Sequence, residues 1–227
     1  MTSRVFFIGL MVFACTFMQA QTLKNGEVLI SDGMELIYVE GYAEDSGVLG
    51  GGIKGFHIGK FEVTQAQWMA VMGSNPSKSS RGDNYPVDNV SWNDVQAFIL
   101  KLNELTRKNY RLPSEIEWGY AAIGGNISQG YEFAGSHVID DVAWFRTNSG
   151  NATKPVGQKN PNELGIYDMS GNVSEWCQDL FDNNRGANRV YRGGSWRDIA
   201  SLCRVAGRRS INPNTRNNAI GFRLVLQ

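Results

Sequence analysis

KPVGQKNPNELGIYDMSGNVSEWCQD, residues 154–179, decides how the second half of this chain folds. Gly, Asn and Pro interrupt short apolar pieces here, and they do so from about residue 126 to the end of the chain. We therefore expect irregular loops, turns and short strands in this half. So much loop needs bound metal or large buried side chains to order it. Six tryptophans, spread along the chain, can each bury a large area.

The first half of the chain predicts regular structure. The alternating stretch GMELIYVEG, residues 33–41, predicts a strand, and the glycine-rich residues 48–64 predict a hairpin. Thr64, Ser91 and Ser114 are typical first residues of helices, and Gln or Glu follows the first and the third by three positions. After Ser91, apolar side chains at helical spacing predict one buried face: Val95, Phe98, Ile99, Leu102 and Leu105.

Size and charge indicate one globular domain. The chain has 227 residues, of which 42% are hydrophobic, and its 22 basic residues balance 22 acidic ones. That length allows one sizeable core, and residues 21–227 contain no low-complexity linker. A balanced charge does not attract nucleic acid or anionic lipid. We therefore expect no nucleic-acid partner.

Residues 1–20 have the pattern of a secretory signal peptide. Arg4 precedes an apolar run, and Ala20 is a small residue before the expected cleavage point. The run is shorter than the roughly 20 residues of a membrane span, so we expect no transmembrane segment in the mature chain. The product would be exported, to the periplasm, the cell surface or the medium. A cut before Cys15, which would add a lipid anchor, is the alternative.

Cleavage after Ala20 leaves two cysteines in the mature chain, Cys177 and Cys203. In an exported protein a disulfide between them is the leading interpretation. Two buried free thiols are the alternative.

Several long motifs together resemble the formylglycine-generating enzyme (sulfatase-modifying factor) family over essentially the whole mature chain. The resemblance implies an α+β fold with a C-type-lectin-like core and much irregular structure. The motifs occur in the family's order: RLPSEIEWGYAA (111–122), the stretch at 154–179, RVYRGGSW (189–196) and IGFRLV (220–225). Four arginines inside such motifs are expected to tie loops to carbonyls and carboxylates: Arg111, Arg192, Arg204 and Arg223.

Catalytic members of this family are copper-dependent oxidases that convert a substrate cysteine into formylglycine. They hold Cu(I) with two cysteines after the GGS motif, because soft thiolates suit that ion. Counted without a gap, the two positions are Asp198 and Cys203, whereas alignment on RVAGR places Cys203 outside the pair. One thiolate is missing either way, so copper is not expected and the resemblance predicts a non-catalytic member. An oxidase acting through Cys203 on sulfatase cysteines is the alternative.

Another branch of the family, similar to the sulfoxide synthase of ergothioneine synthesis, needs three histidine ligands to iron. This chain has two histidines, and neither lies in a metal-binding spacing.

The resemblance also implies a structural calcium site. Its ligands would be the side chains of Asp168 and Glu175 and the backbone carbonyls of Gly171 and Val173. Calcium accepts about six to eight oxygens in flexible geometry, which a turn containing glycine can supply. The alternative is a turn whose two carboxylates cap backbone amides.

The C-terminal tail resembles the variable region of target proteins of diversity-generating retroelements. In such regions the side chains between framework positions vary while the loop keeps its shape, as in an antibody paratope. The tail is therefore predicted to bind a ligand, a protein or another surface ligand, through nine residues: Arg197, Asp198, Ile199, Ser201, Leu202, Gly207, Arg209, Ser210 and Ile211. An ordinary family tail and a structural component of cell-envelope machinery are the alternatives.

Overall fold

The structure, a computed structural model, describes residues 25, 26, 28–43, 52–78, 82–182 and 187–227. The predicted signal peptide, its cleavage point and Cys15 lie outside these residues, as does the start of the predicted hairpin at 48–51.

Three helices begin where the sequence predicts them. The side chains of Thr64, Ser91 and Ser114 each accept a hydrogen bond from the backbone amide of the residue three positions later. The side chain of that later residue in turn accepts a hydrogen bond from the backbone amide of the first residue. Each such cap contributes about 1 kcal/mol. The helices are α1 (Gln65–Met72), α2 (Trp92–Thr106) and α3 (Glu115–Ala122).

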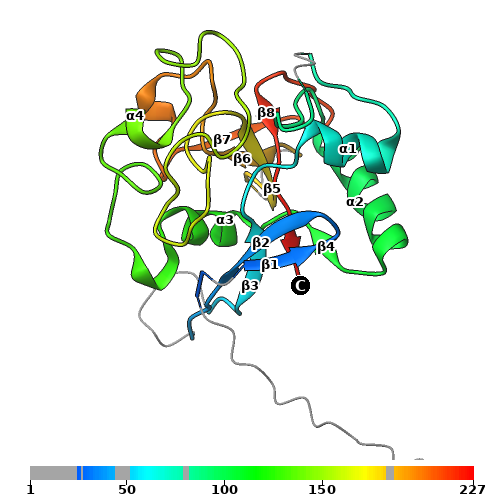
Figure 1. Cartoon of the computed structure of the whole chain (residues 1–227), viewed down its shortest axis with the longest axis horizontal. Helices are drawn as coiled ribbons and strands as arrows, with labels where there is room; N and C mark the ends of the chain where they lie inside the picture. The colour runs from blue at the N-terminus through cyan, green and yellow to red at the C-terminus, as the bar shows by residue number, and fades with distance from the viewer. Residues whose placement is uncertain (1–24, 27, 44–51, 79–81, 183–186) are drawn as a thin grey trace, which may run out of the picture.

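Helices α1 and α2 pack together through the predicted apolar face of α2. The rings of Trp68 and Phe98 stack at 5.0 Å between centroids. Val95, Phe98, Ile99 and Leu102 are buried, as predicted. Leu105 is 64% exposed, so its predicted burial is wrong. It lies in the last turn of α2, at the end of that helix that extends away from α1 (Figure 1).

A five-stranded sheet occupies the lower part of the molecule in Figure 1 and contains the last strand of the chain, β9. The strand predicted at residues 33–41 is confirmed as β2. The described part of the predicted hairpin at 48–64 forms one strand, β3, whose antiparallel partner is β2 rather than a second strand of that stretch. The sheet order is β1-β2-β3-β9-β4, so β9 lies between β3 and β4. The strands are β1 (Val28–Ser31), β2 (Met34–Val39), β3 (Phe56–Gly59), β4 (Tyr110–Arg111) and β9 (Val225–Leu226).

A four-stranded sheet carries the motifs of the second half, in the order β7-β6-β5-β8. Strand β8 runs parallel to β5, and β7 is an edge strand that pairs with β6. These strands are β5 (Ser174–Leu180), β6 (Arg189–Arg192), β7 (Arg208–Ile211) and β8 (Ile220–Gly221).

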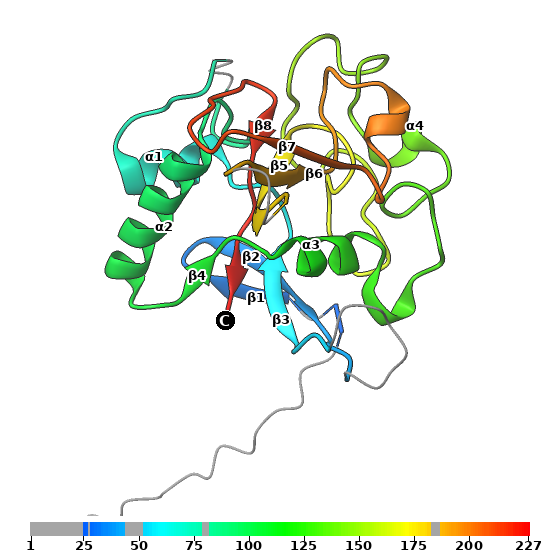
Figure 2. The ribbon, with the colours of Figure 1, turned by 180° about the vertical axis from the view of Figure 1, so that it is seen from behind.

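Long loops make up much of the chain after α3, as predicted. The loop between α3 and β5 contains the 3-10 helix η1 (Gly125–Ile127) and α4 (Ile139–Val142), and the loop between β6 and β7 contains the 3-10 helix η2 (Ala200–Leu202). Figures 1 and 2 show α1 and α2 on one flank of the molecule, and α4 with the orange η2 on the other. The fold is therefore a mixed α+β domain, as predicted.

Tryptophans order much of the loop structure. Trp68, Trp92, Trp118 and Trp176 are at most 9% exposed. The indole N–H of Trp92 donates to the Cys177 carbonyl and that of Trp176 to the Val90 carbonyl. Within the described residues, no helix combines the length and the apolar character that crossing a membrane requires.

Candidate functional site

The GGSW motif brings the tail close to the core. Gly193 and Gly194 have φ angles of 89° and 71°, which favour glycine. A Cβ atom on Gly194 would lie 2.6 Å from the sulfur of Cys203, and one on Gly193 would lie 3.1 Å from the Trp118 ring. The backbone at these glycines therefore packs directly against Cys203 and Trp118.

Both cysteines are buried free thiols. Cys203 lies in an apolar cluster with Phe145 and Val142, and burial, assisted by the Asp198 carboxylate, raises the pKa of its thiol to about 12. Cys177 lies in a different cluster, where burial raises its pKa well above the usual value. The leading interpretation of a disulfide is therefore wrong, because the two side chains belong to separate apolar clusters.

Asp198, at the first counted copper position, is held by an arginine. The two Nη atoms of Arg209 donate to the Asp198 carboxylate oxygens at 3.0 and 2.9 Å, and the Ser195 hydroxyl also donates to it. Burial acts to raise the pKa of Asp198, but the bonds from Arg209 and Ser195 hold it below its usual value. An arginine-bound carboxylate next to a protonated thiol does not fit Cu(I), which requires soft thiolates.

Four of the nine predicted ligand-binding residues are exposed side by side around η2. We call them the tail face: Arg197, Ile199, Ser201 and Leu202. Ile199 and Leu202 are 46% and 37% exposed, although both are large apolar side chains. The tail face therefore presents two apolar anchors among polar neighbours.

The other five predicted residues are less exposed. Asp198 and Arg209 form the ion pair described above. Gly207, Ser210 and Ile211 are half-buried in or next to β7, and Ile211 packs against the main apolar cluster. The structure thus separates the predicted set into an exposed turn and a supporting strand.

Short hydrogen bonds fix the backbone beneath the tail face. The Leu202 amide donates to the Ile199 carbonyl at 3.0 Å. Arg146 donates through its amide to the Asp198 carbonyl and through Nε to the Arg197 carbonyl, both at 3.0 Å. The side chains of the tail face can therefore change without loss of the bonds that shape the turn.

The predicted calcium ligand Glu175 is already paired inside the protein. Arg223 donates through Nε and Nη2 to its two carboxylate oxygens, each at 2.7 Å, and both side chains are 0% exposed. The indole N–H of Trp118 donates to one of these oxygens at 2.7 Å. Arg223 also donates to the carbonyls of Gly59 and Tyr167, each at 2.8 Å.

Asp168, the other predicted calcium side chain, has one oxygen available. Its Oδ2 accepts from the Gly157 amide at 2.7 Å, whereas its buried Oδ1 has no hydrogen-bond partner among the described residues. No group of three or more His, Cys, Asp or Glu side chains in the described part of the chain is arranged to hold a metal ion. Of the two predicted side-chain ligands, Asp168 therefore has an oxygen without a partner, whereas both oxygens of Glu175 are already bonded. Calcium stays a prediction.

The expected role of the four motif arginines is confirmed. Arg111 makes a bidentate pair with Glu117, and Arg192 bonds Glu115 and the Val205 carbonyl. Arg204 pairs with Glu132. Each arginine therefore ties two separate loops or elements together.

Sequence reasoning missed one buried carboxylate, Glu62, which accepts from the Val173 amide and the Asn172 side chain. Burial, together with the carboxylates of Asp168 and Glu175, raises its pKa well above the usual value. Its position between Phe61 and Val63 was a signal, because a charged residue between apolar ones in a strand-like stretch needs a buried partner.

It also missed a pocket beside α3, formed by residues from five separate parts of the chain. No local pattern marks that pocket.

Comparison with known proteins gives a family and a fold. The family described as "Sulfatase-modifying factor enzyme 1-like domain" matches residues 14–227. The chaperone protein LppX of Paenibacillus barcinonensis is 32% identical over 266 aligned positions, which cover 93% of each chain. The formylglycine-generating enzyme of Streptomyces coelicolor is 33% identical over 71% of this chain and 58% of that enzyme.

The solved structure of Treponema denticola variable protein 1 superposes with a TM-score of 0.73 at 28% identity, covering 88% of this chain and 98% of that one. Such agreement confirms the expected C-type-lectin-like architecture. With a family match that spans nearly all of its residues, the chain belongs to the sulfatase-modifying factor (formylglycine-generating enzyme) family.

Proposed function

We propose that this protein is an exported, non-catalytic member of its family that binds a protein ligand through the tail face. One observation carries the proposal: the residues at the expected copper positions are buried or already paired, whereas the turn next to them is exposed to solvent. Cys203 is buried and protonated, and Asp198 is held by Arg209. Ile199 and Leu202 are exposed a few residues away.

The composition of the tail face suits contact with a protein. Apolar side chains surrounded by polar ones are typical of the centre and rim of interfaces, and arginine is enriched there. The turn is also held in one shape by the bonds from Arg146, so little ordering is needed on binding. A rigid turn with changeable side chains is the arrangement that diversification of the tail would require.

The relatives are consistent with binding. LppX is a chaperone by name and matches over nearly its whole length. The Treponema protein is called variable and has the same architecture. Both similarities favour a role in contact with other molecules.

A binding experiment tests the tail face. The double variant Ile199→Asp/Leu202→Asp should lose the partner that the wild-type chain retains from a preparation of exported proteins. The control is Leu100→Asp, which introduces the same charge at a leucine that is 63% exposed on α2. Equal retention by all three proteins would refute the role of the tail face.

An activity experiment tests the non-catalytic assignment. Purified protein supplied with Cu(I) and a cysteine-containing sulfatase peptide should leave the peptide mass unchanged. Formation of formylglycine, lost on Cys203→Ala, would instead establish the oxidase.

A genomic observation tests diversification. A reverse transcriptase gene near a second copy of the codons for residues 190–225, differing where that copy has adenine, would support it. Absence of both would leave a fixed binding face, and neighbouring genes for envelope machinery would favour the structural role.

A further inference from the structure

A pocket of about 540 Å³ lies between α3 and the loop that precedes β7. Its volume lies in the range of about 300 to 1,000 Å³ that is usual for small-molecule sites. None of the four residues of the tail face lines this pocket, although its wall includes Val205 and Ala206, which follow Leu202 closely in the chain. Figures 1 and 2 show α3, on the other wall, apart from η2. The pocket and the tail face are therefore neighbouring but distinct surfaces.

The wall of the pocket is apolar and partly aromatic. Tyr42 and Tyr120 meet edge to face, with ring centroids 5.1 Å apart. Ile116, on α3, and Ile123, directly after the end of α3, line the same space and are 45% and 40% exposed. Two large apolar side chains exposed along this short helix and its C-terminal end indicate a surface that a ligand can cover.

The polar end of the pocket carries one carboxylate oxygen that accepts no hydrogen bond from the described residues. Glu115 is neutralised by Arg192 at 2.8 Å and by Arg208 at 2.7 Å. Asp179 accepts the Glu115 amide with Oδ2 at 2.6 Å. Among the described residues, its second oxygen has no hydrogen-bond donor, and Arg208 interacts with Asp179 electrostatically without forming a salt bridge to it.

The cations beside the pocket are already committed. Arg192 donates through Nη1 to Glu115 and through Nη2 to the Val205 carbonyl at 2.7 Å, and its Nε is buried without a hydrogen-bond partner among the described residues. An anionic ligand would therefore find only that buried Nε, whereas a cationic one would find the open oxygen of Asp179.

We infer that this pocket binds a small organic cation, an amine joined to an aromatic or aliphatic body. The ammonium group bonds the second oxygen of Asp179, and the body packs against Tyr42, Tyr120 and Ile116. Charge-assisted bonds of this kind are about twice as strong as neutral ones, and an apolar wall strengthens them further. This site goes beyond the proposed function and does not depend on it.

Three probes with the same body test the charge preference: phenethylamine, 3-phenylpropionate and 2-phenylethanol. Titration of the full chain, followed by amide NMR shifts that include Gly119, should show saturable binding of phenethylamine. The alcohol should bind about tenfold more weakly or worse, and the anion should not bind. Failure of phenethylamine to bind, or equal binding of the anion, would overturn the inference.

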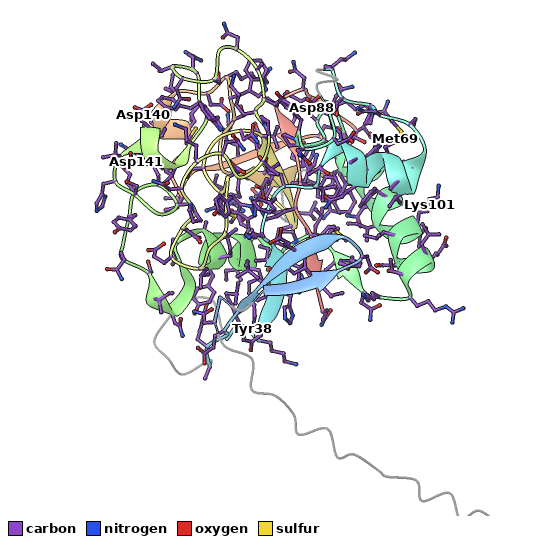
Figure 3. The ribbon with its side chains drawn as sticks, viewed as in Figure 1. Tyr38, Met69, Asp88, Lys101, Asp140 and Asp141 are labelled. Atoms are coloured by element: carbon purple, nitrogen blue, oxygen red, sulfur yellow. The ribbon has the colours of Figure 1, made fainter. Side chains whose placement is uncertain are left out.

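Two variants locate the site. Asp179→Asn keeps an oxygen for the Glu115 amide and removes the charge, so phenethylamine should bind about tenfold more weakly or worse. Asp140→Asn, on α4, is the matched control and should bind as wild type does (Figure 3). Unchanged binding by Asp179→Asn would overturn the assignment.

If Asp179→Asn does not fold, the variant Ala206→Phe tests the location of the site instead. Ala206 is exposed and lines the pocket, so a phenyl ring there fills the space without entering the core. Loss of phenethylamine binding with an unchanged melting temperature supports the site, and retained binding refutes it.

Discussion

Replacement of Glu175 by Gln tests how much stability the buried ion pair controls. The change keeps the size of the side chain but leaves the Arg223 guanidinium, which is 0% exposed, opposite a neutral partner. Removal of one member of a buried pair costs about 3 to 5 kcal/mol, because the other charge stays buried without compensation. A domain of this size loses about 2 to 4 °C per kcal/mol, so the melting temperature should fall by about 6 to 20 °C.

Thermal and urea denaturation, both followed by circular dichroism, measure the change. The double variant Glu175→Met/Arg223→Met should be less destabilised than the sum of its single variants, because it leaves no unpaired charge. The matched control is Arg216→Met, which breaks a bidentate pair with Asp94 in which the arginine side chain is 60% exposed. Exposed pairs contribute little, so its melting temperature should stay close to that of wild type.

Comparison of the melting temperatures of these variants tests whether the buried ion pair contributes to stability. If Glu175→Gln melts as Arg216→Met does, the buried pair does not contribute to stability and our account of it is wrong. If the double variant is as unstable as the sum of the singles, the cost comes from lost hydrogen bonds to Trp118 and Gly59 rather than from an unpaired charge.

Three further outcomes are expected. Asp88 is buried (Figure 3), and burial raises its pKa to about 6, above the usual value of about 3.9. Protonation of Asp88 therefore stabilises the folded protein at low pH, and this stabilisation is lost as the pH rises through about 6. Between about pH 4 and pH 7 the melting temperature of wild type should fall relative to that of Asp88→Asn, and parallel curves would contradict this. Cys177 and Cys203 should resist thiol reagents at about pH 8 until guanidinium is added, and a linked peptide pair in an unreduced digest would show the disulfide instead. The melting temperature of wild type should be higher in calcium than in EDTA, whereas that of Asp168→Asn should be the same in both. An unchanged melting temperature of wild type would contradict the predicted calcium site.

Local rules account for what could be predicted in the first half of the chain. Thr64, Ser91 and Ser114 begin helices because each has a side chain that satisfies an amide three residues away, and that information lies within four residues. Leu105 has the right spacing for burial, but whether a neighbouring element reaches it depends on the lengths of two helices. Spacing along one helix does not contain that information.

The candidate site required contacts between distant residues. The side chain of Glu62 bonds that of Asn172, 110 residues away, and Arg223 bonds the Gly59 carbonyl, 164 residues away. The tail motif includes residues that the structure exposes, such as Ile199. It could not show that Asp198 faces Arg209 rather than a ligand, because that pairing depends on how β7 turns back beside η2.

The position of β9 has a consequence for any chain whose tail is rewritten. This strand comes after the tail, at residues 225–226, yet it pairs with both β3 and β4 inside the five-stranded sheet. A stop codon or a shifted reading frame in the tail would remove β9 and separate β3 from β4. Completion of this sheet therefore requires that the whole tail be translated in frame, whatever side chains that tail displays.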